Sequence, residues 1–242
     1  MILMLLLVPL MAVGKPPGIN KPEPEPINTF SLNKENTIIF RGVVNGMSVA
    51  KFGDRLLKMS AKAKEDAIFY LVLDSPGGSI YSGLSLISLI QSVPQKIHCV
   101  ALFAASMAHT ILQACPGNRY VASNNGVVMI HRARGGFSGQ FNNGEVESQL
   151  VFWRKLVGKM EKDNATRMKY GYKYYKARAK DEWWCSTKQC VTERFADAIV
   201  NLKCDASLLK TKIELGKGYY YSGCPLIRGP LKHARYRAYP FR

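Results

Sequence analysis

Short apolar runs alternate with amphipathic segments through the centre of the chain. Continuous apolar runs rich in β-branched and aromatic residues predict strands buried on both faces, and apolar positions three or four residues apart predict helices. Because strand and helix alternate, the pattern predicts an α/β fold with a mostly parallel sheet. The predicted strands are 37–40, 67–73, 96–103, 119–122, 127–130 and 198–200, and the predicted helices are 47–62, 81–91, 107–114, long helical material over 145–180, and a short helix from about 193.

The N-terminal end has a different pattern. Residues 1–14 are almost entirely apolar. This segment is too short to cross a bilayer, because a spanning helix needs about 20 residues. The length and the small residues Ala12 and Gly14 suit a secretory signal, although the usual basic start is missing and a retained apolar terminus is the alternative. Residues 15–29 are rich in proline and charge and predict an extended linker.

The C-terminal end combines aromatic and basic residues without an apolar period. We therefore predict that residues 207–242 form an irregular basic extension and not a second domain. The folded domain should then span residues 30–206.

Charge is unevenly distributed. The chain has 47% hydrophobic and 21% charged residues, which indicates a globular protein, and its 34 Lys+Arg against 17 Asp+Glu give a net charge of +17. Residues 151–242 hold 21 of the basic and 8 of the acidic side chains. This asymmetry suggests an acidic partner such as nucleic acid, anionic lipid or acidic protein. A solvated face is the simpler interpretation, since no fingerprint of a nucleic-acid-binding module is present.

Six cysteines are compatible with either redox compartment. Cys99 lies in an apolar run and is expected to be a buried thiol. If the protein is exported, the pairs Cys185/Cys190 and Cys204/Cys224 are candidate disulfides. No cysteine spacing is typical of zinc binding, so we expect no metal site.

A glycine pair follows the second predicted strand. In Ser75-Pro76-Gly77-Gly78, proline ends the strand and two glycines allow backbone conformations closed to other residues. Because a helix begins shortly afterwards, backbone N–H groups here can stabilise a developing oxyanion. The same residues also make an ordinary turn.

Ser106 lies between a predicted buried strand and an apolar helix. Its neighbours Ala104, Ala105 and Ala108 are small, so another backbone or a substrate can approach. The hydroxyl can cap the helix. As a nucleophile it would have the N–H of Met107 beside it and would need a base.

The base is best supplied by His131, which ends a strand and can emerge at a sheet edge. The other histidines are less suited: His98 begins a strand, His109 is a packing or surface residue of the helix, and His233 lies in the tail.

These motifs together carry a resemblance to a known family. Ser-Pro-Gly-Gly (75–78), Ala-Ala-Ser-Met (104–107), Met-Ile-His (129–131) and Gly-Gly-Phe-Ser-Gly-Gln (135–140) resemble, in order and spacing, the proteolytic subunit of the Clp protease, over roughly Thr37 to Leu202. The resemblance implies a ClpP/crotonase-like fold of repeated ββα units with a protruding helical handle. It also implies a serine endopeptidase that acts on peptides or unfolded proteins within a homo-oligomeric ring, without metal or cofactor.

The family motifs assign roles to particular residues. The catalytic serine falls on Ser106, the histidine on His131, and the oxyanion donors on the N–H groups of Gly78 and Met107. The family's aspartate falls on Asp181, where it would orient the imidazole. Asp181 could instead be a surface charge or a helix cap, and Glu182 is its nearest competitor.

The chain departs from the family in three places: the signal-like start, the basic stretch 162–180 where the family has its ring-packing helix region, and the tail beyond Leu202. We therefore expect an extracytoplasmic protein, exported or membrane-tethered, resembling extracytoplasmic peptidases or phage capsid-maturation proteases of the fold. No ATP would be available to an exported enzyme, so pairing with an ATP-driven unfoldase (an AAA+ ATPase) is not expected.

Three other readings compete with a peptidase. The first is a non-catalytic scaffold or binding module of the same fold that uses its basic surface. The second is an acyl-CoA hydratase or isomerase of the same superfamily, which needs oxyanion N–H groups but no serine-histidine pair. The third is a Ser/Lys peptidase site, which His131 makes unnecessary.

Overall fold

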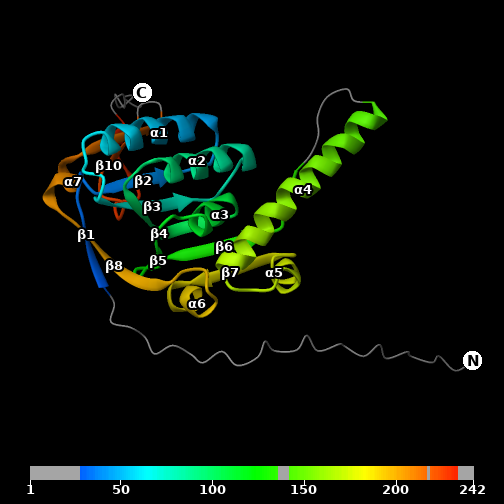
Figure 1. Ribbon diagram of the computed structural model, residues 1–242. Helices are drawn as coiled ribbons and strands as arrows, with labels where there is room; N and C mark the ends of the chain where they lie inside the picture. Colours follow the sequence, from blue (N-terminus) through cyan, green and yellow to red (C-terminus); the bar gives the residue numbers. More distant parts are fainter. Residues whose placement is uncertain (1–27, 136–141, 217–218, 234–242) are drawn as a thin grey trace, which may run out of the picture.

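A computed structural model describes residues 28–135, 142–216 and 219–233, and Figure 1 shows their arrangement. The signal-like segment 1–14, nearly all of the linker and the last nine residues lie outside the described ranges. Among the described residues, no helix is both long and apolar enough to cross a membrane.

The centre is an eight-stranded, mostly parallel sheet with the order β1-β8-β5-β4-β3-β2, in which β6 pairs with β4 and with the antiparallel β7. This confirms the predicted α/β class. The strands are β1 (Asn28–Leu32), β2 (Thr37–Arg41), β3 (Ile68–Ser75), β4 (Lys96–Ala105), β5 (Arg119–Ala122), β6 (Val127–His131), β7 (Glu182–Ser186) and β8 (Ala198–Cys204).

The helices α1 and α2 lie together over one face of the sheet (Figure 1). Their apolar positions make the core that the periodicity predicts: Phe52 and Leu56 of the first and Leu86 of the second are buried against Phe40 and Leu71 of the strands. The helices of the domain are α1 (Gly46–Ser60), α2 (Ile80–Ser92), α3 (Met107–Gln113), α4 (Asn143–Arg167), α5 (Tyr172–Arg178) and α6 (Thr187–Thr192).

Sequence and structure differ at both ends of the domain. The long helical material divides into α4 and α5, and α5 begins after Gly171, which is its N-cap. The antiparallel β7 was not predicted, and α6 precedes the position expected for the short helix near 193. The strand β1 was not predicted either: it begins at Asn28, within the predicted linker and two residues before the predicted start of the domain.

The long helix α4 projects away from the sheet, as Figure 1 shows. Near its end, the buried Asn164 side chain donates to Thr110 Oγ1 of α3 at 3.0 Å and to Tyr175 Oη of α5 at 3.3 Å. This polar junction fixes the base of the projecting helix against the helix that follows Ser106.

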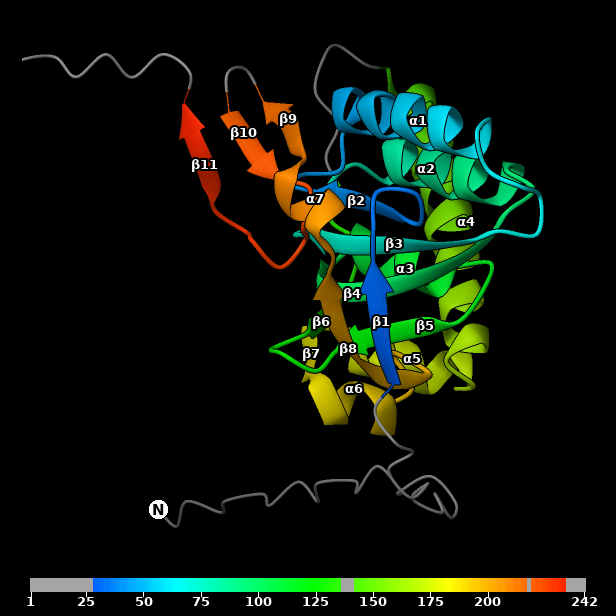
Figure 2. The same cartoon turned by 90° about the vertical axis from the view of Figure 1, so that its left-hand side faces the viewer.

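The C-terminal extension is more regular than predicted. After α7 (Ala206–Lys210), β9 (Lys212–Gly216), β10 (Tyr219–Ser222) and β11 (Pro230–His233) form a small antiparallel sheet, seen beside the main sheet in Figure 2. The prediction of an irregular extension is therefore wrong for these segments.

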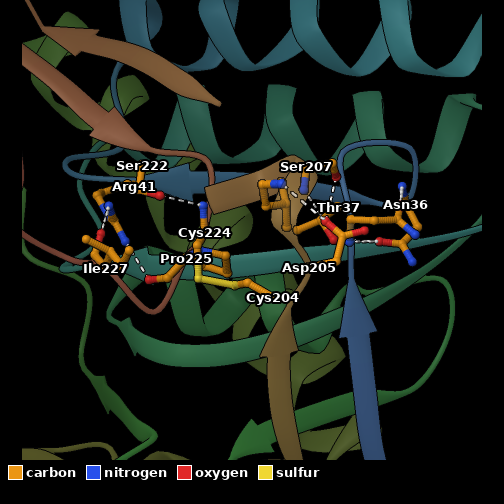
Figure 3. The surroundings of a disulfide bond; sticks show 12 residues. Asn36, Thr37, Arg41, Cys204, Asp205, Ser207, Ser222, Cys224, Pro225 and Ile227 are labelled. Carbon is orange, nitrogen blue, oxygen red and sulfur yellow. Dashed lines mark hydrogen bonds between the residues drawn. A yellow bond between two sulfur atoms is a disulfide. The ribbon is translucent and has the colours of Figure 1, made fainter. Parts of the chain in front are cut away.

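Polar contacts and a disulfide, not an apolar period, anchor this extension (Figure 3). Cys224 is bonded to Cys204 at the end of β8, and Arg41 donates to the carbonyls of Pro225 at 2.8 Å and Ile227 at 3.2 Å. Arg228 forms an ion pair with Asp74 of β3, which also pairs with Arg41 at 2.9 Å. The extension thus contacts the strand that leads into the glycine pair.

All six cysteines form disulfides. The candidate pairs Cys185–Cys190 and Cys204–Cys224 are confirmed. The expectation of a buried thiol at Cys99 is wrong, because this residue pairs with Cys115 beyond α3. The strand before Ser106 is thereby cross-linked to the chain that follows the next helix.

Candidate active site

Three neighbouring parallel strands end at the same edge of the sheet. Ser75 of β3 is in register with Ala104 of β4, and Ala105 is in register with Met129 of β6. The residues that follow these strand ends therefore meet at the carboxyl edge, the usual place for ligand sites in open α/β sheets. They are the glycine pair after β3, Ser106 after β4 and His131 at the end of β6.

Ser106 Oγ and His131 Nε2 lie 2.8 Å apart, within hydrogen-bond distance. The two residues are 25 positions apart in sequence, and the strand pairing brings them together because the backbone N–H of Ser106 donates to the carbonyl of Met129 at 2.8 Å. The hydroxyl makes no capping hydrogen bond to α3, although Ser106 is the N-cap residue. The capping role considered from the sequence is therefore not the one that the hydroxyl adopts.

Ser106 has an unusual backbone, with φ 56° and ψ −118°. For a residue with a side chain this conformation costs on the order of 1–3 kcal/mol and persists only where the surroundings impose it. Gly77 supplies one constraint: a Cβ there would lie 2.6 Å from the carbonyl oxygen of Ala105 and 2.7 Å from the nitrogen of Met107. The glycine thus permits close packing on the strained turn.

The glycine pair is held against the loop before α1. Val44 donates to the carbonyl of Gly77 at 2.8 Å, and Ser79 donates to the carbonyl of Val44 at 2.8 Å. The N–H groups of Gly78 and Met107 donate to no other residue in the described ranges. Both residues line a cavity of about 220 Å³ together with Ser106 and His131. Two unused donors thus border the space next to the serine hydroxyl.

His131 is half-buried, and its pKa is lowered from the ordinary value. Burial is the main cause, because it disfavours the imidazolium, and the charge of Arg134 lowers the pKa further. Glu182 acts in the opposite direction. The imidazole is therefore neutral at pH 7 and can accept a proton at Nε2.

The Nδ1 atom of His131 is buried and has no hydrogen-bond partner among the described residues. Asp181 is exposed and directly precedes β7, whose first residue, Glu182, pairs with His131 across the strands. The Glu182 carboxylate accepts from Trp184 Nε1 at 2.8 Å. The structure thus brings two predicted triad members into contact, with Asp181 in the adjacent segment but without a hydrogen bond to the imidazole.

His98 and His109 take no part in this cluster. His109 is fully buried, stacks edge-on against Phe195 with ring centroids 5.3 Å apart, and has its pKa lowered to about 3 by burial and by the charge of Arg119. His98 Nδ1 accepts from the N–H of Asn118 at 2.9 Å. Within the described ranges, no group of three His, Cys, Asp or Glu side chains is placed to hold a metal ion.

Two contributors to the site were not found from the sequence. Arg134 lines the cavity and acts on the pKa of His131, and its place three residues after the histidine was the available signal. Thr110, also at the cavity, is fixed by Asn164 of α4, a contact 54 residues apart that no local pattern indicates.

Comparison with known proteins gives one family. A family model described as Clp protease matches residues 26–203. The chain is 32% identical over 126 residues to the ATP-dependent Clp protease proteolytic subunit 1 of Leifsonia xyli subsp. xyli, covering 51% of this chain and 63% of that protein. It is 34% identical over 110 residues to the ATP-dependent Clp protease proteolytic subunit of Ostreococcus tauri, covering 45% of this chain and 54% of that protein. The matched region is less than two thirds of either relative.

Proposed function

Because the chain belongs to the Clp protease family, we propose that it is a serine endopeptidase with Ser106 as the nucleophile and His131 as the general base. The single observation that carries this proposal is the 2.8 Å contact between Ser106 Oγ and His131 Nε2 beside a cavity. A hydroxyl nucleophile needs such a base, and a non-catalytic member of the fold does not.

The mechanism follows from the positions of these atoms. Ser106 Oγ attacks the peptide carbonyl while its proton passes to His131 Nε2. The N–H groups of Gly78 and Met107 stabilise the tetrahedral oxyanion. The C–N bond breaks as His131 returns the proton to the amine, leaving an acyl-enzyme. Water, deprotonated by His131, then attacks the ester and releases the acid and the free serine.

Asp181 is the third member of the triad in this proposal. The charge of His131 in the transition state calls for an acceptor at Nδ1, which is buried and unpartnered. Glu182 already accepts from Trp184, so Asp181, one residue away, remains available. The relay is complete when the Asp181 carboxylate accepts from Nδ1–H of His131.

The assembly and compartment of the protein also belong to the proposal. We propose a homo-oligomeric ring that takes peptides or unfolded proteins, without an ATP-driven unfoldase. Three disulfides support an extracytoplasmic location, because such bonds persist in oxidising compartments.

The direct test is peptide hydrolysis by Ser106→Ala. We expect the rate to fall to background while the circular dichroism spectrum stays unchanged, since Ser106 is the only described hydroxyl hydrogen-bonded to His131. Ser85→Ala is the matched control, because this exposed serine of α2 only donates to the carbonyl of Tyr81. Equal hydrolysis by the Ser106 variant and the wild type would reject the assignment.

A non-catalytic scaffold that uses its basic surface is the alternative function. It requires that neither the wild type nor the Ser106 variant cleaves peptides, and that a polyanion binds with strong salt dependence.

A further inference from the structure

A second, larger cavity adjoins the one at Ser106. It has a volume of about 650 Å³ and lies between the segment that follows β6 and the helices α4 and α5. Ile80, Ala133 and Arg134 line both cavities, so the two spaces share a wall. We call the larger one the basic groove.

Four cations line the basic groove: Arg132 and Arg134 after β6, Arg154 on α4, and Lys176 on α5. In the described part of the chain, none of the three arginines forms an ion pair. All three arginines are exposed to solvent. Positive charge without an internal partner therefore gathers beside the catalytic cavity.

The one acidic side chain of the basic groove does not neutralise these arginines. Glu161 is 9% exposed and accepts from the hydroxyl of Tyr172 at 3.0 Å. The Lys176 ammonium lies 5.9 Å from the centroid of the same tyrosine ring. Glu161 is thus engaged at the buried wall, and the net charge of the groove remains positive.

Apolar side chains complete the walls. Leu150, Trp153 and Val157 of α4 face the basic groove, and Trp153 packs edge-on against Tyr81 of α2 with ring centroids 5.4 Å apart. Walls of low polarity strengthen the field of charges in a cleft and raise the local concentration of ligands of opposite sign. The groove therefore combines anion attraction with room for aliphatic stems.

We propose that the basic groove binds acidic side chains of the peptide substrate, so that bonds within Asp- and Glu-rich segments are cleaved in preference to neutral ones. The inference rests on the proposed peptidase function and adds the substrate class. Because the two cavities share a wall, a peptide whose scissile carbonyl lies at Ser106 can place a neighbouring residue in the basic groove. An extended peptide advances about 3.3 Å per residue, so this residue is only a few positions away.

A peptide fits the basic groove better than a nucleic acid does. Single-stranded nucleic acids are held by aromatic rings with open faces as well as by charge. Here Trp153 packs on Tyr81, and the Tyr172 ring is approached by Lys162 and Lys176. The groove also shares its wall with the Ser106 cavity, which a peptide must occupy for cleavage.

The experiment compares two fluorogenic peptides that differ only in Glu against Gln at the positions flanking the scissile bond. At low ionic strength we expect kcat/KM to be about tenfold higher for the Glu peptide, because each of a few ion pairs raises kcat/KM about two- to fivefold. The ratio of kcat/KM for the Glu peptide to kcat/KM for the Gln peptide (the Glu/Gln ratio) should approach one in 1 M salt, where the Debye length is about 3 Å.

Arg154→Gln isolates the basic groove from the net charge of the protein. We expect it to lower the Glu/Gln ratio roughly two- to fivefold. Lys155→Gln is the matched control: it removes the same charge from the next position of α4, is exposed, and does not line the groove, so the ratio should stay unchanged.

The outcomes separate this inference from the proposed function. A Glu/Gln ratio of one, or equal effects of the Arg154 and Lys155 variants, overturns the acidic preference while hydrolysis by Ser106 stands. Binding of an oligonucleotide that depends on Arg154, without discrimination between the peptides, likewise overturns it in favour of nucleic acid. Failure to cleave either peptide, with Ser106 unreactive to a fluorophosphonate, rejects the peptidase function and the inference with it.

Discussion

Ser106 differs from an ordinary helix N-cap in two ways that support one another. Its backbone is held at a positive φ, and its hydroxyl contacts His131 instead of the first turn of α3. An N-cap serine whose hydroxyl accepts from a backbone N–H of the first turn would stabilise the helix by about 1 kcal/mol. Here that stabilisation is absent and the backbone is strained in addition, which is the pattern expected of a residue selected for function.

The pH dependence of hydrolysis should report on His131. The base must be neutral, and burial and the charge of Arg134 lower the pKa of His131. As the pH falls, kcat/KM should therefore stay constant until below about 6.5 and decline only at lower pH. Arg134→Gln removes a positive charge that disfavours the imidazolium, so the pKa rises and the acidic limb moves to higher pH. The measurement is kcat/KM for a neutral peptide against pH, with Lys155→Gln as the control. An acidic limb that stays in place or moves to lower pH would contradict the proximity of Arg134 to the base.

The choice between Asp181 and Glu182 can be tested by paired amide variants. Asp181→Asn should lower kcat by about 10³- to 10⁴-fold, because the imidazole loses the group that orients it and stabilises its charge. Glu182→Gln keeps an acceptor for Trp184 and should change kcat by less than about threefold. The assay is hydrolysis of one peptide by both variants under identical conditions. The reverse order of effects would assign the role to Glu182.

At the scale of single residues, the sequence was sufficient where a motif combines several residue types. Ser106 and His131 were predicted from their motifs, and the structure brings them into contact. Asp181 was predicted as the partner of His131 Nδ1, but this atom has no hydrogen-bond partner among the described residues. The pairing of Cys99 with Cys115 was missed because it depends on how α3 folds back along β4.

At the scale of elements, the registers of β3, β4 and β6 account for the convergence of the site. Each strand end supplies one part, and the glycine pair lets the β3 loop approach the turn after β4. A slip of one residue in any of these pairings would turn every side chain of that strand to the opposite face. The buried apolar faces of the strands therefore fix the site as well as the core.

Gly77→Ala tests this dependence. The new Cβ would lie 2.6 Å from the carbonyl oxygen of Ala105, at a residue with φ +90°, so the turn at Ser106 must shift. We expect a loss of roughly 2 kcal/mol or more in the free energy of unfolding and a loss of hydrolysis. Both are measured by urea denaturation and peptide assay.

Gly46→Ala is the control for this substitution. Its Cβ would meet nothing within 4 Å, and it lies in the first turn of α1, so stability should stay within about 0.5 kcal/mol of the wild type. If the two alanine variants behaved alike, close packing of the glycine loop on the serine turn would not be required.

Six strands and the helices α1 to α3 of the central domain were predicted because each carries its own apolar pattern. The edge strand β1 was not predicted, because it lies at the end of the proline-rich segment and buries only Leu32 fully. The antiparallel β7 has only alternate residues buried and is five residues long, so its pattern was too short to indicate a strand. The small sheet of the extension depends on the Cys204–Cys224 bond and on Arg41, partners that lie far away in sequence. Non-local anchors of this kind leave no periodicity in the segment that they hold.

At the scale of the whole molecule, the three disulfides lie at the parts of the fold that carry the site. Cys99–Cys115 spans Ser106, and Cys185–Cys190 follows Asp181 within β7 and α6. Cys204–Cys224 fixes the extension whose Arg228 contacts Asp74, four residues before Gly78. Cross-links at all three places stabilise the carboxyl edge of the sheet, because they reduce the conformational entropy of the unfolded chain.

Reduction should therefore affect stability and activity together. The Cys99–Cys115 and Cys204–Cys224 bonds close loops of 16 and 20 residues, each of which contributes on the order of 3 kcal/mol. We expect dithiothreitol to lower the midpoint of urea unfolding and the rate of hydrolysis in parallel. A peptide map without reductant should recover the three linked pairs. Free thiols in protein purified from an oxidising compartment, or a midpoint that dithiothreitol does not change, would contradict this account.

The most direct measurement of the central claim is covalent labelling by a fluorophosphonate, read by mass spectrometry of the digested protein. The account predicts one modified residue, Ser106, with labelling abolished in His131→Ala and preserved in His109→Leu, since His109 is buried apart from the cavity. Labelling at a different serine, or undiminished labelling of Ser106 without His131, would contradict it.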